Sequence, residues 1–103
     1  MVYIQLIHWN ISEAQERAER LEKAGYEVAF ELGPVPALLK ELKTNPPEAV
    51  VIDLSRLPSQ GRDVGVALRS FGSTRRVPLL FVGGDPQKAA LVRQKLPDAV
   101  YTA

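Results

Sequence analysis

The chain has 103 residues, 46% of them hydrophobic, and its 13 basic and 12 acidic residues give a net charge of +1. This length suits one domain, and the near-neutral balance argues against nucleic-acid binding, which normally shows a clustered basic excess. The chain contains no cysteine, which excludes disulfides, thiolate metal sites and cysteine nucleophiles. We therefore expect a single domain over residues 1–103 with no nucleic-acid partner.

The sequence shows no targeting or membrane segment. Residues 1–8 lack the basic n-region and the small-residue cleavage site of a signal peptide. The longest apolar runs are far shorter than a bilayer-spanning helix requires. We expect a cytoplasmic protein that does not contact a membrane.

Strand-like and helix-like segments alternate along the chain. Short apolar or alternating runs indicate strands, and apolar residues spaced three and four apart indicate helices. The predicted elements are strands at 2–7, 26–31, 49–54, 77–82 and 99–101, and helices at 12–24, 35–43, 63–71 and 86–96. This order predicts an α/β fold, a flavodoxin-like doubly wound parallel sheet of five strands in the order 2-1-3-4-5.

Local signals predict where the helices begin and end. Ser12, with Gln15 three residues later, matches a capping box at the start of the first helix, and Gly25 matches its stop. Asp85 is the predicted N-cap of the last helix. Residues 57–61 are predicted to form a loop before the third helix.

Charged side chains of the first helix follow a regular spacing. The acids stand four residues before the bases, in the favoured order, at Glu13–Arg17, Glu16–Arg20 and Glu19–Lys23. We interpret these charges as a solvated helix surface. Arg62, Arg75 and Arg76 are interpreted as solvated surface too.

Ligands of a doubly wound sheet bind beyond the carboxyl ends of its strands, so residues there are candidates for a site. His8 and Trp9 follow the first strand, Asp53 ends the third, and Gly83 follows the fourth. His8 and Asp53 end neighbouring strands, so we expect either a structural hydrogen-bonded pair or bonds from Asp53 to nearby backbone amides. A catalytic pair would need a nucleophile, and no serine is evidently well placed, so we expect no enzyme activity.

Several segments resemble the receiver domain of bacterial response regulators, the CheY-like domain. They cover nearly the whole chain in the right order, and the resemblance is strongest around Asp53. The segments are Leu6-Ile7-His8-Trp9-Asn10, Ala37-Leu38-Leu39-Lys40-Glu41-Leu42, Pro47-Glu48-Ala49-Val50-Val51-Ile52-Asp53-Leu54, Leu57-Pro58 with Gly61, and Val77-Pro78-Leu79-Leu80-Phe81-Val82.

The resemblance implies positions for a phosphoryl-transfer site. A receiver binds Mg²⁺ through an acidic pair after the first strand and accepts a phosphoryl group on an aspartate ending the third. A threonine or serine after the fourth strand and a lysine after the fifth contact that group. Carried over by position, Asp53 is the phosphoacceptor equivalent, His8 and Trp9 replace the acidic pair, and Gly83 replaces the hydroxyl residue.

These replacements imply a degenerate receiver, or pseudo-receiver, that holds no metal or other cofactor. Mg²⁺ prefers oxygen ligands, which neither imidazole nor indole provides. Gly83 has no side chain, and the lysine position would fall beyond Ala103. Asp53 is then the one working position of five that the sequence retains.

Trp9 and the segment of residues 83–86, both at strand ends, can each be interpreted in two ways. Trp9 either fills the space of the missing metal or is a contact residue for a partner. The segment Gly83-Gly84-Asp85-Pro86 either forms a simple turn, which we favour, or offers backbone amides to an anion at a helix N-terminus.

Receivers have a fifth helix after the last strand, and the sequence leaves no residues for one. One face of the sheet should then be partly uncovered, with an exposed edge strand. Three explanations stay open: the chain is a fragment, a second copy covers the face in a homodimer, or a protein partner does.

Three functions follow from these observations. The first is a phosphorylation-independent, receiver-like module for protein interaction in bacterial signalling, which we favour because the metal, hydroxyl and lysine positions are all altered. The second is an atypical response-regulator receiver phosphorylated on Asp53. The third is a small-ligand or nucleotide binder at the carboxyl edge of the strands.

Overall fold

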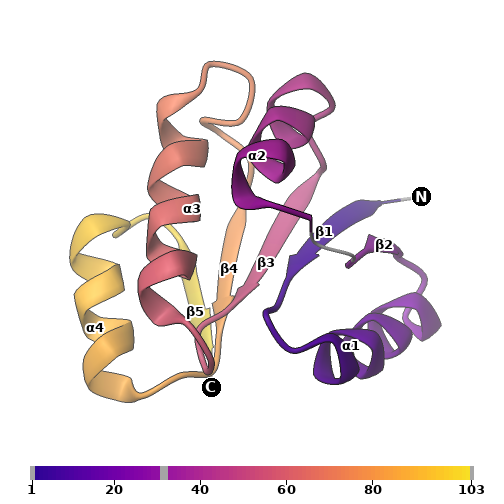
Figure 1. Cartoon of the computed structure of the whole chain (residues 1–103), viewed down its shortest axis with the longest axis horizontal. Coiled ribbons are helices and arrows are strands. Elements are labelled where there is room, and N and C mark those ends of the chain that lie inside the picture. Colours follow the sequence, from indigo (N-terminus) through magenta and orange to yellow (C-terminus); the bar gives the residue numbers. More distant parts are fainter. Residues whose placement is uncertain (1, 31–32, 103) are drawn as a thin grey trace.

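A computed structural model describes residues 2–30 and 33–102. Its five parallel strands form one sheet in the order β2-β1-β3-β4-β5 (Figure 1), which confirms the flavodoxin-like fold. The elements are β1 Tyr3–Ile7, α1 Ile11–Lys23, β2 Glu27–Ala29, α2 Val35–Thr44, β3 Ala49–Asp53, α3 Pro58–Ser70, β4 Leu79–Val82, α4 Pro86–Lys95 and β5 Val100–Thr102. The predicted second strand extended to Glu31, which lies outside the described residues. A search of the described helices finds none long and apolar enough to cross a bilayer.

The sheet separates two apolar layers, because successive residues of a strand point to opposite faces. Val50 and Ile52 of β3 pack into the larger cluster with apolar residues of α2, α3 and α4. Val51, between them, packs instead with Ala14 and Ala18 of α1. Figure 1 shows the same division, with α1 on one side of the sheet and the other three helices on the opposite side. Burial on both faces explains the continuous apolar runs of the strands.

Helix α1 begins earlier than the sequence predicts. Its N-cap is Asn10, whose side-chain oxygen accepts a hydrogen bond from the Glu13 backbone N–H at 3.0 Å, so the predicted cap at Ser12 is wrong. Asparagine is as good a cap as serine, and Asn10 stands close to the end of β1. Ser12 therefore lies inside the first turn. The predicted stop is confirmed, since Gly25 follows the helix with a left-handed φ of +101°.

Helix α3 also begins earlier, and the loop predicted over residues 57–61 is wrong because the helix starts at Pro58. Proline fits the first turn of a helix, where its missing N–H costs nothing. Gly61 is buried inside the helix, where a Cβ would lie 2.9 Å from Leu54 Cδ2 and 3.0 Å from Ile52 Cγ2. This glycine permits close packing of helix on strand and does not mark a loop.

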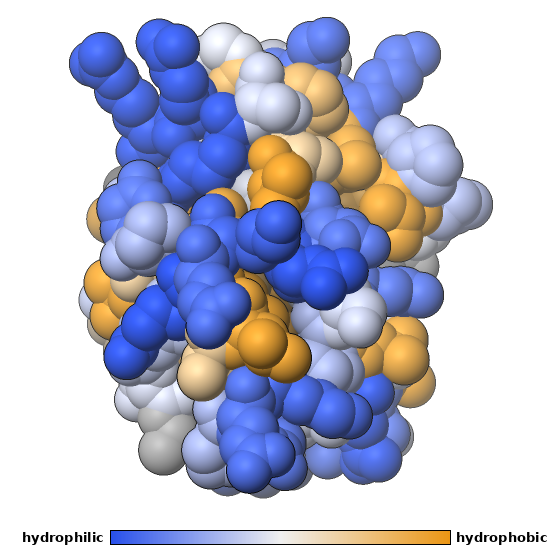
Figure 2. All heavy atoms as spheres, turned by 90° about the vertical axis from the view of Figure 1, so that its left-hand side faces the viewer, coloured by the Kyte–Doolittle hydropathy of each residue, from blue (hydrophilic) through white to orange (hydrophobic). Residues whose placement is uncertain are grey.

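Helix α4 has one apolar side chain in the core and another at the surface. The predicted cap is confirmed, with the Asp85 carboxylate accepting hydrogen bonds from the Gln87 and Lys88 backbone N–H groups. Val92 is buried, yet its neighbour Leu91 is 58% exposed. On the side of the molecule that carries α4, apolar residues reach the surface between strongly hydrophilic ones (Figure 2).

The face of the sheet that carries α1 is incompletely covered, as the sequence predicts. A groove of about 400 Å³ runs beside α1 over the strands. Ile4 and Val51 lie at its floor, and Val100 of the edge strand β5 is 61% exposed at its rim. Among the described helices, α1 is the one packed on this side.

Close packing of α3 on the sheet predicts a large effect of one substitution. A Cβ at Gly65 would lie 2.7 Å from Leu96 Cδ1 and 3.0 Å from Phe81 Cζ, both in the core. Gly65→Val should lower the free energy of unfolding by about 1 to 3 kcal/mol, because overpacking displaces core side chains. Urea denaturation measures this change.

The matched control is Gly72→Val, because a Cβ at Gly72 has open space within 4 Å. We expect a change of less than about 0.5 kcal/mol for this exposed turn. Equal losses for the two variants would contradict the packing argument.

Candidate functional site

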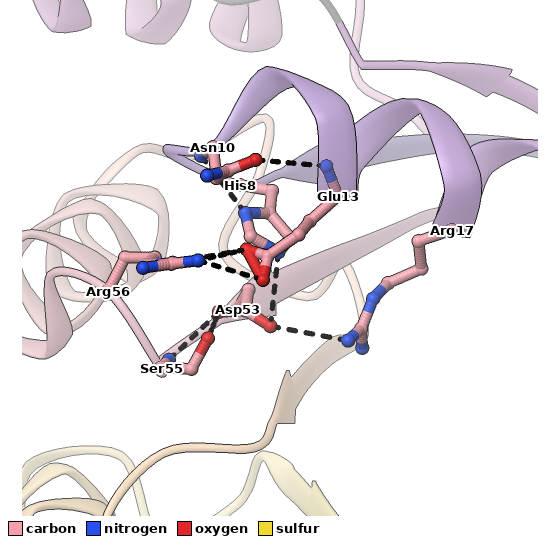
Figure 3. Close-up of polar contacts among 7 residues, drawn as sticks. All are labelled: His8, Asn10, Glu13, Arg17, Asp53, Ser55 and Arg56. Atoms are coloured by element: carbon pink, nitrogen blue, oxygen red, sulfur yellow. Dashed lines mark hydrogen bonds and ion pairs between the residues drawn. The ribbon is translucent and has the colours of Figure 1, made fainter.

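Asp53 is the last residue of β3, and it lies inside the molecule with 1% of its surface exposed. A buried carboxylate needs partners to offset the loss of hydration. Its Oδ1 accepts hydrogen bonds from the Ser55 backbone N–H, at 2.8 Å, and from the Ser55 hydroxyl (Figure 3). The prediction that Asp53 bonds to a nearby backbone amide is therefore confirmed.

The other carboxylate oxygen of Asp53 faces two nitrogen groups. His8 Nε2 lies 3.5 Å from Oδ2, so the two side chains are neighbours, as the sequence places them, and the predicted hydrogen bond between them stays a prediction. The Arg17 guanidinium lies 3.5 Å from the same oxygen, brought there from α1 on the neighbouring layer. Both groups in contact with Oδ2 are therefore side chains of this chain.

His8 is buried, and its ring is fixed by a backbone contact. Its Nδ1 accepts a hydrogen bond from the Asn10 backbone N–H at 3.1 Å. A neutral imidazole carries one N–H, so the proton sits on Nε2, the nitrogen that faces Asp53. The residue that replaces an acid of the receiver pattern therefore turns its N–H side toward the carboxylate.

Arg17 does not pair with Glu13, so that part of the sequence interpretation is wrong. Its side chain is 35% exposed and reaches inward from α1 to the buried carboxylate. Glu13, one turn earlier, instead contacts the Arg56 guanidinium at 3.0 Å and lies 3.7 Å from His8 Nε2. The pairing predicted between Glu16 and Arg20 is confirmed, at 2.8 Å on the helix surface.

The Glu13–Arg56 contact links α1 to the loop after β3. Arg56 donates three hydrogen bonds of 3.0 to 3.1 Å to the Glu13 carboxylate, two of them from one nitrogen. Figure 3 shows this pair beside His8 and Asp53, on the same side of the sheet edge. The pair is half exposed, so it contributes little stability alone, but it holds the loop that carries Ser55 against α1.

Gly83 stands beside Asp53, as the resemblance places it. A Cβ there would lie 3.8 Å from Asp53 Oδ2 and 3.9 Å from Ser55 Cβ. The residue has a left-handed φ of +71°, which a serine or threonine adopts only with strain. A single substitution would therefore not restore the hydroxyl that receivers have at this point.

The segment after Gly83 forms a turn, the favoured interpretation. Gly84 also has a left-handed φ, and a Cβ there would lie 2.8 Å from Leu54 Cβ. The Asp85 carboxylate takes the first amides of α4, so the chain itself supplies the anion at this helix N-terminus.

Trp9 lies apart from the contacts that hold Asp53. It is half-buried and packs against the larger core cluster, and with His8, Ile11 and Phe30 it lines a hollow of about 250 Å³. This placement leaves its two interpretations, a filler of the metal position and a contact residue, as predictions.

Sequence reasoning missed two residues of the site, Ser55 and Arg17. Ser55 follows Asp53 by two residues, the spacing at which an aspartate caps a turn, so a local signal existed. Arg17 gave no such signal, because helical spacing paired it with Glu13 and only the fold brings it to Asp53. Among the described residues, no group of three or more His, Asp and Glu side chains is arranged to hold a metal ion.

Solved receiver structures share this fold. The chain superimposes on the chemotaxis protein CheY4 of Vibrio cholerae with a TM-score of 0.80 at 18% identity, over 100% of this chain and 86% of that one. A putative response regulator of Chloroflexus aurantiacus gives 0.82 at 21% identity, covering 99% and 84%. The receiver domain of a sensor histidine kinase from Pseudomonas aeruginosa, solved with a coordinated magnesium ion, gives 0.76 at 20% identity, covering 99% and 84%. No protein-family model and no curated protein sequence matches the chain.

The chain therefore has the fold of a CheY-like receiver domain. The residues at its strand ends do not fit the Mg²⁺ ion of that fold, because an imidazole and an indole replace the acidic pair. The Arg17 guanidinium also lies 3.5 Å from Asp53 Oδ2. A dication there would be repelled by the resident cation.

Replacement of Arg17 should destabilise the fold more than replacement of Arg20, an exposed basic residue of the same helix. Arg17→Gln leaves Asp53 Oδ2 without its cation in the interior, and we expect a loss of about 1 to 3 kcal/mol in free energy of unfolding. Arg20→Gln, on the same helix, removes an exposed pair and should cost less than about 0.5 kcal/mol.

A double-variant cycle separates the contact from general effects of the substitution. Asp53→Asn removes the buried charge, so adding Arg17→Gln to it should cost less than the same change in the natural chain. Additive losses in urea denaturation would show that Arg17 does not stabilise Asp53.

Proposed function

We propose that this chain is a phosphorylation-independent, receiver-like module that acts through protein contacts in bacterial signalling and has no catalytic activity. One observation carries the proposal: both oxygens of Asp53 are engaged by groups of the chain itself, and the side chain is almost fully buried. A phosphoryl donor would have to displace these groups before reaching the nucleophile.

The chemistry of phosphoryl transfer supports this proposal. A carboxylate attacks a phosphoryl group only when cations neutralise the approaching negative charge. The cation present, Arg17, is paired with the nucleophile, where it lowers the electron density available for attack. Gly83 contributes no hydroxyl toward the transferred group.

A second candidate, an atypical receiver phosphorylated on Asp53, has one observation in its favour. Ser55 brings a hydroxyl, and Arg17 a cation, to the same carboxylate. These are the chemical groups that receivers supply from the fourth and fifth strands, here delivered from other positions. The burial of Asp53 is the reason we place this candidate second.

Small-ligand or nucleotide binding at this edge has less support. The hollow lined by His8, Arg17 and Ser55 measures about 190 Å³, and the one beside Trp9 measures about 250 Å³. Ligand sites usually measure roughly 300 to 1,000 Å³. Each acidic and basic side chain of the first hollow also has an ion-pair partner in the chain, which leaves little unmatched charge for a ligand.

A direct test of the proposal is exposure to acetyl phosphate with Mg²⁺. Intact-mass spectrometry should show no adduct of about 80 Da, the mass of one phosphoryl group. A receiver that retains its acidic pair, hydroxyl and lysine, treated in parallel, shows that the donor is active. An adduct that disappears in Asp53→Ala would contradict the proposal and favour the atypical receiver.

The incompletely covered face beside α1 is the surface we propose for contact with a second copy or a protein partner. Its groove is lined almost entirely by apolar residues, and large apolar patches on soluble domains mark interaction sites. The exposed edge of β5 adjoins the same groove.

Self-association through this face predicts dimerisation that depends on concentration. Sedimentation velocity between about 10 μM and 1 mM should detect the dimer. Val100→Glu should weaken it by placing a charge in the apolar contact, whereas Val66→Glu, exposed on α3 across the sheet, should not. A monomer throughout this range would exclude the second copy as the occupant.

A further inference from the structure

A shallow groove between α3 and α4 combines an apolar floor with a basic rim. Pro58, Ser59 and Arg62 of α3 face Lys88, Leu91 and Val92 of α4 across about 160 Å³. The two helices pack side by side on the side of the sheet opposite α1 (Figure 1). Neither the receiver-like site nor the uncovered sheet face uses this surface.

The charge of the two helices differs from that of the rest of the chain. Together α3 and α4 carry five basic residues and one acidic residue. The whole chain has 13 basic and 12 acidic residues, so the remainder has 8 basic and 11 acidic. The near-neutral total therefore conceals an excess of basic residues in these two helices, and such an excess favours acidic partners over basic ones.

The two basic groups at the groove differ in their partners. Lys88 forms no ion pair within residues 2–30 and 33–102, and Arg62 pairs with its neighbour Asp63 at the exposed surface. The first amides of α3 have no side-chain cap, so the positive end of that helix dipole also faces this end of the groove. Carboxylates placed here would meet cations and backbone donors together.

The α3–α4 groove also presents apolar side chains. Leu91 is 58% exposed on the groove wall, and Val92 lies buried at its floor. Figure 2 shows this side of the molecule, where apolar surface lies between hydrophilic side chains. The groove has no aromatic side chain on which a nucleobase could stack, which favours a peptide over a nucleic acid.

We infer that the α3–α4 groove docks an acidic, amphipathic segment of a protein partner. The apolar residues of such a segment contact Leu91 and Pro58. Its carboxylates face Lys88 and Arg62. The inference rests on the proposed role as an interaction module, and it names the class of partner and a surface distinct from the sheet face.

A synthetic probe tests this surface without knowledge of the natural partner. The probe is a fluorescent peptide of about 16 residues, built from Glu, Leu and Ala with leucines three and four residues apart, the spacing of a groove-binding helix. Its counterpart has Lys in place of every Glu. Fluorescence anisotropy with the full chain should show binding of the acidic peptide alone, and amide NMR shifts should centre on residues 58–62 and 88–92.

Matched variants locate the contact. Lys88→Glu should weaken acidic-peptide binding about tenfold, because it replaces an attraction with a repulsion at the rim. Lys95→Glu makes the same change of charge two turns away on α4, at about 10 Å along the helix, and should weaken binding less than about threefold. Leu91→Ser should weaken binding, whereas Val66→Ser, equally a surface substitution, should not.

Several results would overturn the inference. They are no binding up to about 1 mM, equal binding of the basic peptide, equal effects of Lys88→Glu and Lys95→Glu, or tighter binding of a single-stranded oligonucleotide than of the acidic peptide. None of these results bears on phosphorylation of Asp53, whose mass test is independent of this groove.

Discussion

The Asp53 carboxylate lies in the interior, where an unpaired charge would cost as much as a sizeable part of the stability of a small domain. Its position at the end of β3 leaves it no bulk water, so other elements must supply its partners. The loop after β3 supplies the Ser55 amide and hydroxyl, β1 leads to His8, and α1 supplies Arg17. One buried charge thus determines how three segments meet at this edge of the sheet.

We propose that this arrangement changes what the carboxylate can do. In a receiver an exposed aspartate is a nucleophile that waits for a metal and a phosphoryl donor. Here Asp53 is an acceptor whose oxygens already receive contacts from the chain, with the Glu13–Arg56 pair beside it. Under the proposed function, the interactions of this chain with other molecules should depend on surfaces other than the Asp53 carboxylate.

The sequence predicted the fold well because the relevant signals are local and repeated. Apolar strand runs and helix spacing give the βα order, and the handedness of the crossovers leaves one common topology. It also placed His8, Asp53 and Gly83 at one edge, because the carboxyl ends of parallel strands meet there. The predicted start of α1 was wrong because both Asn10 and Ser12 can serve as its N-cap. The predicted start of α3 was wrong because Gly61, which suggested a loop, packs tightly inside the helix.

The site could be predicted only in part, for a physical reason. Spacing along α1 gives Arg17 a partner in Glu13, and the sequence does not show that the buried Asp53 attracts it more strongly. Glu13 in turn pairs with Arg56, from a loop more than 40 residues away. Contacts of this kind depend on burial and on distances in the folded chain, and the periodicity of the sequence gives neither.

The measurement that tests this account most directly is the response of the amide NMR spectrum to beryllofluoride with Mg²⁺, a stable mimic of a phosphoryl group on a carboxylate. If Asp53 is compensated by Arg17, His8 and Ser55, the signals of Asp53, Ser55 and Gly83 should stay unchanged. Saturable shifts centred on these residues, and lost in Asp53→Asn, would show that the carboxylate is free to accept a phosphoryl group and would contradict the account.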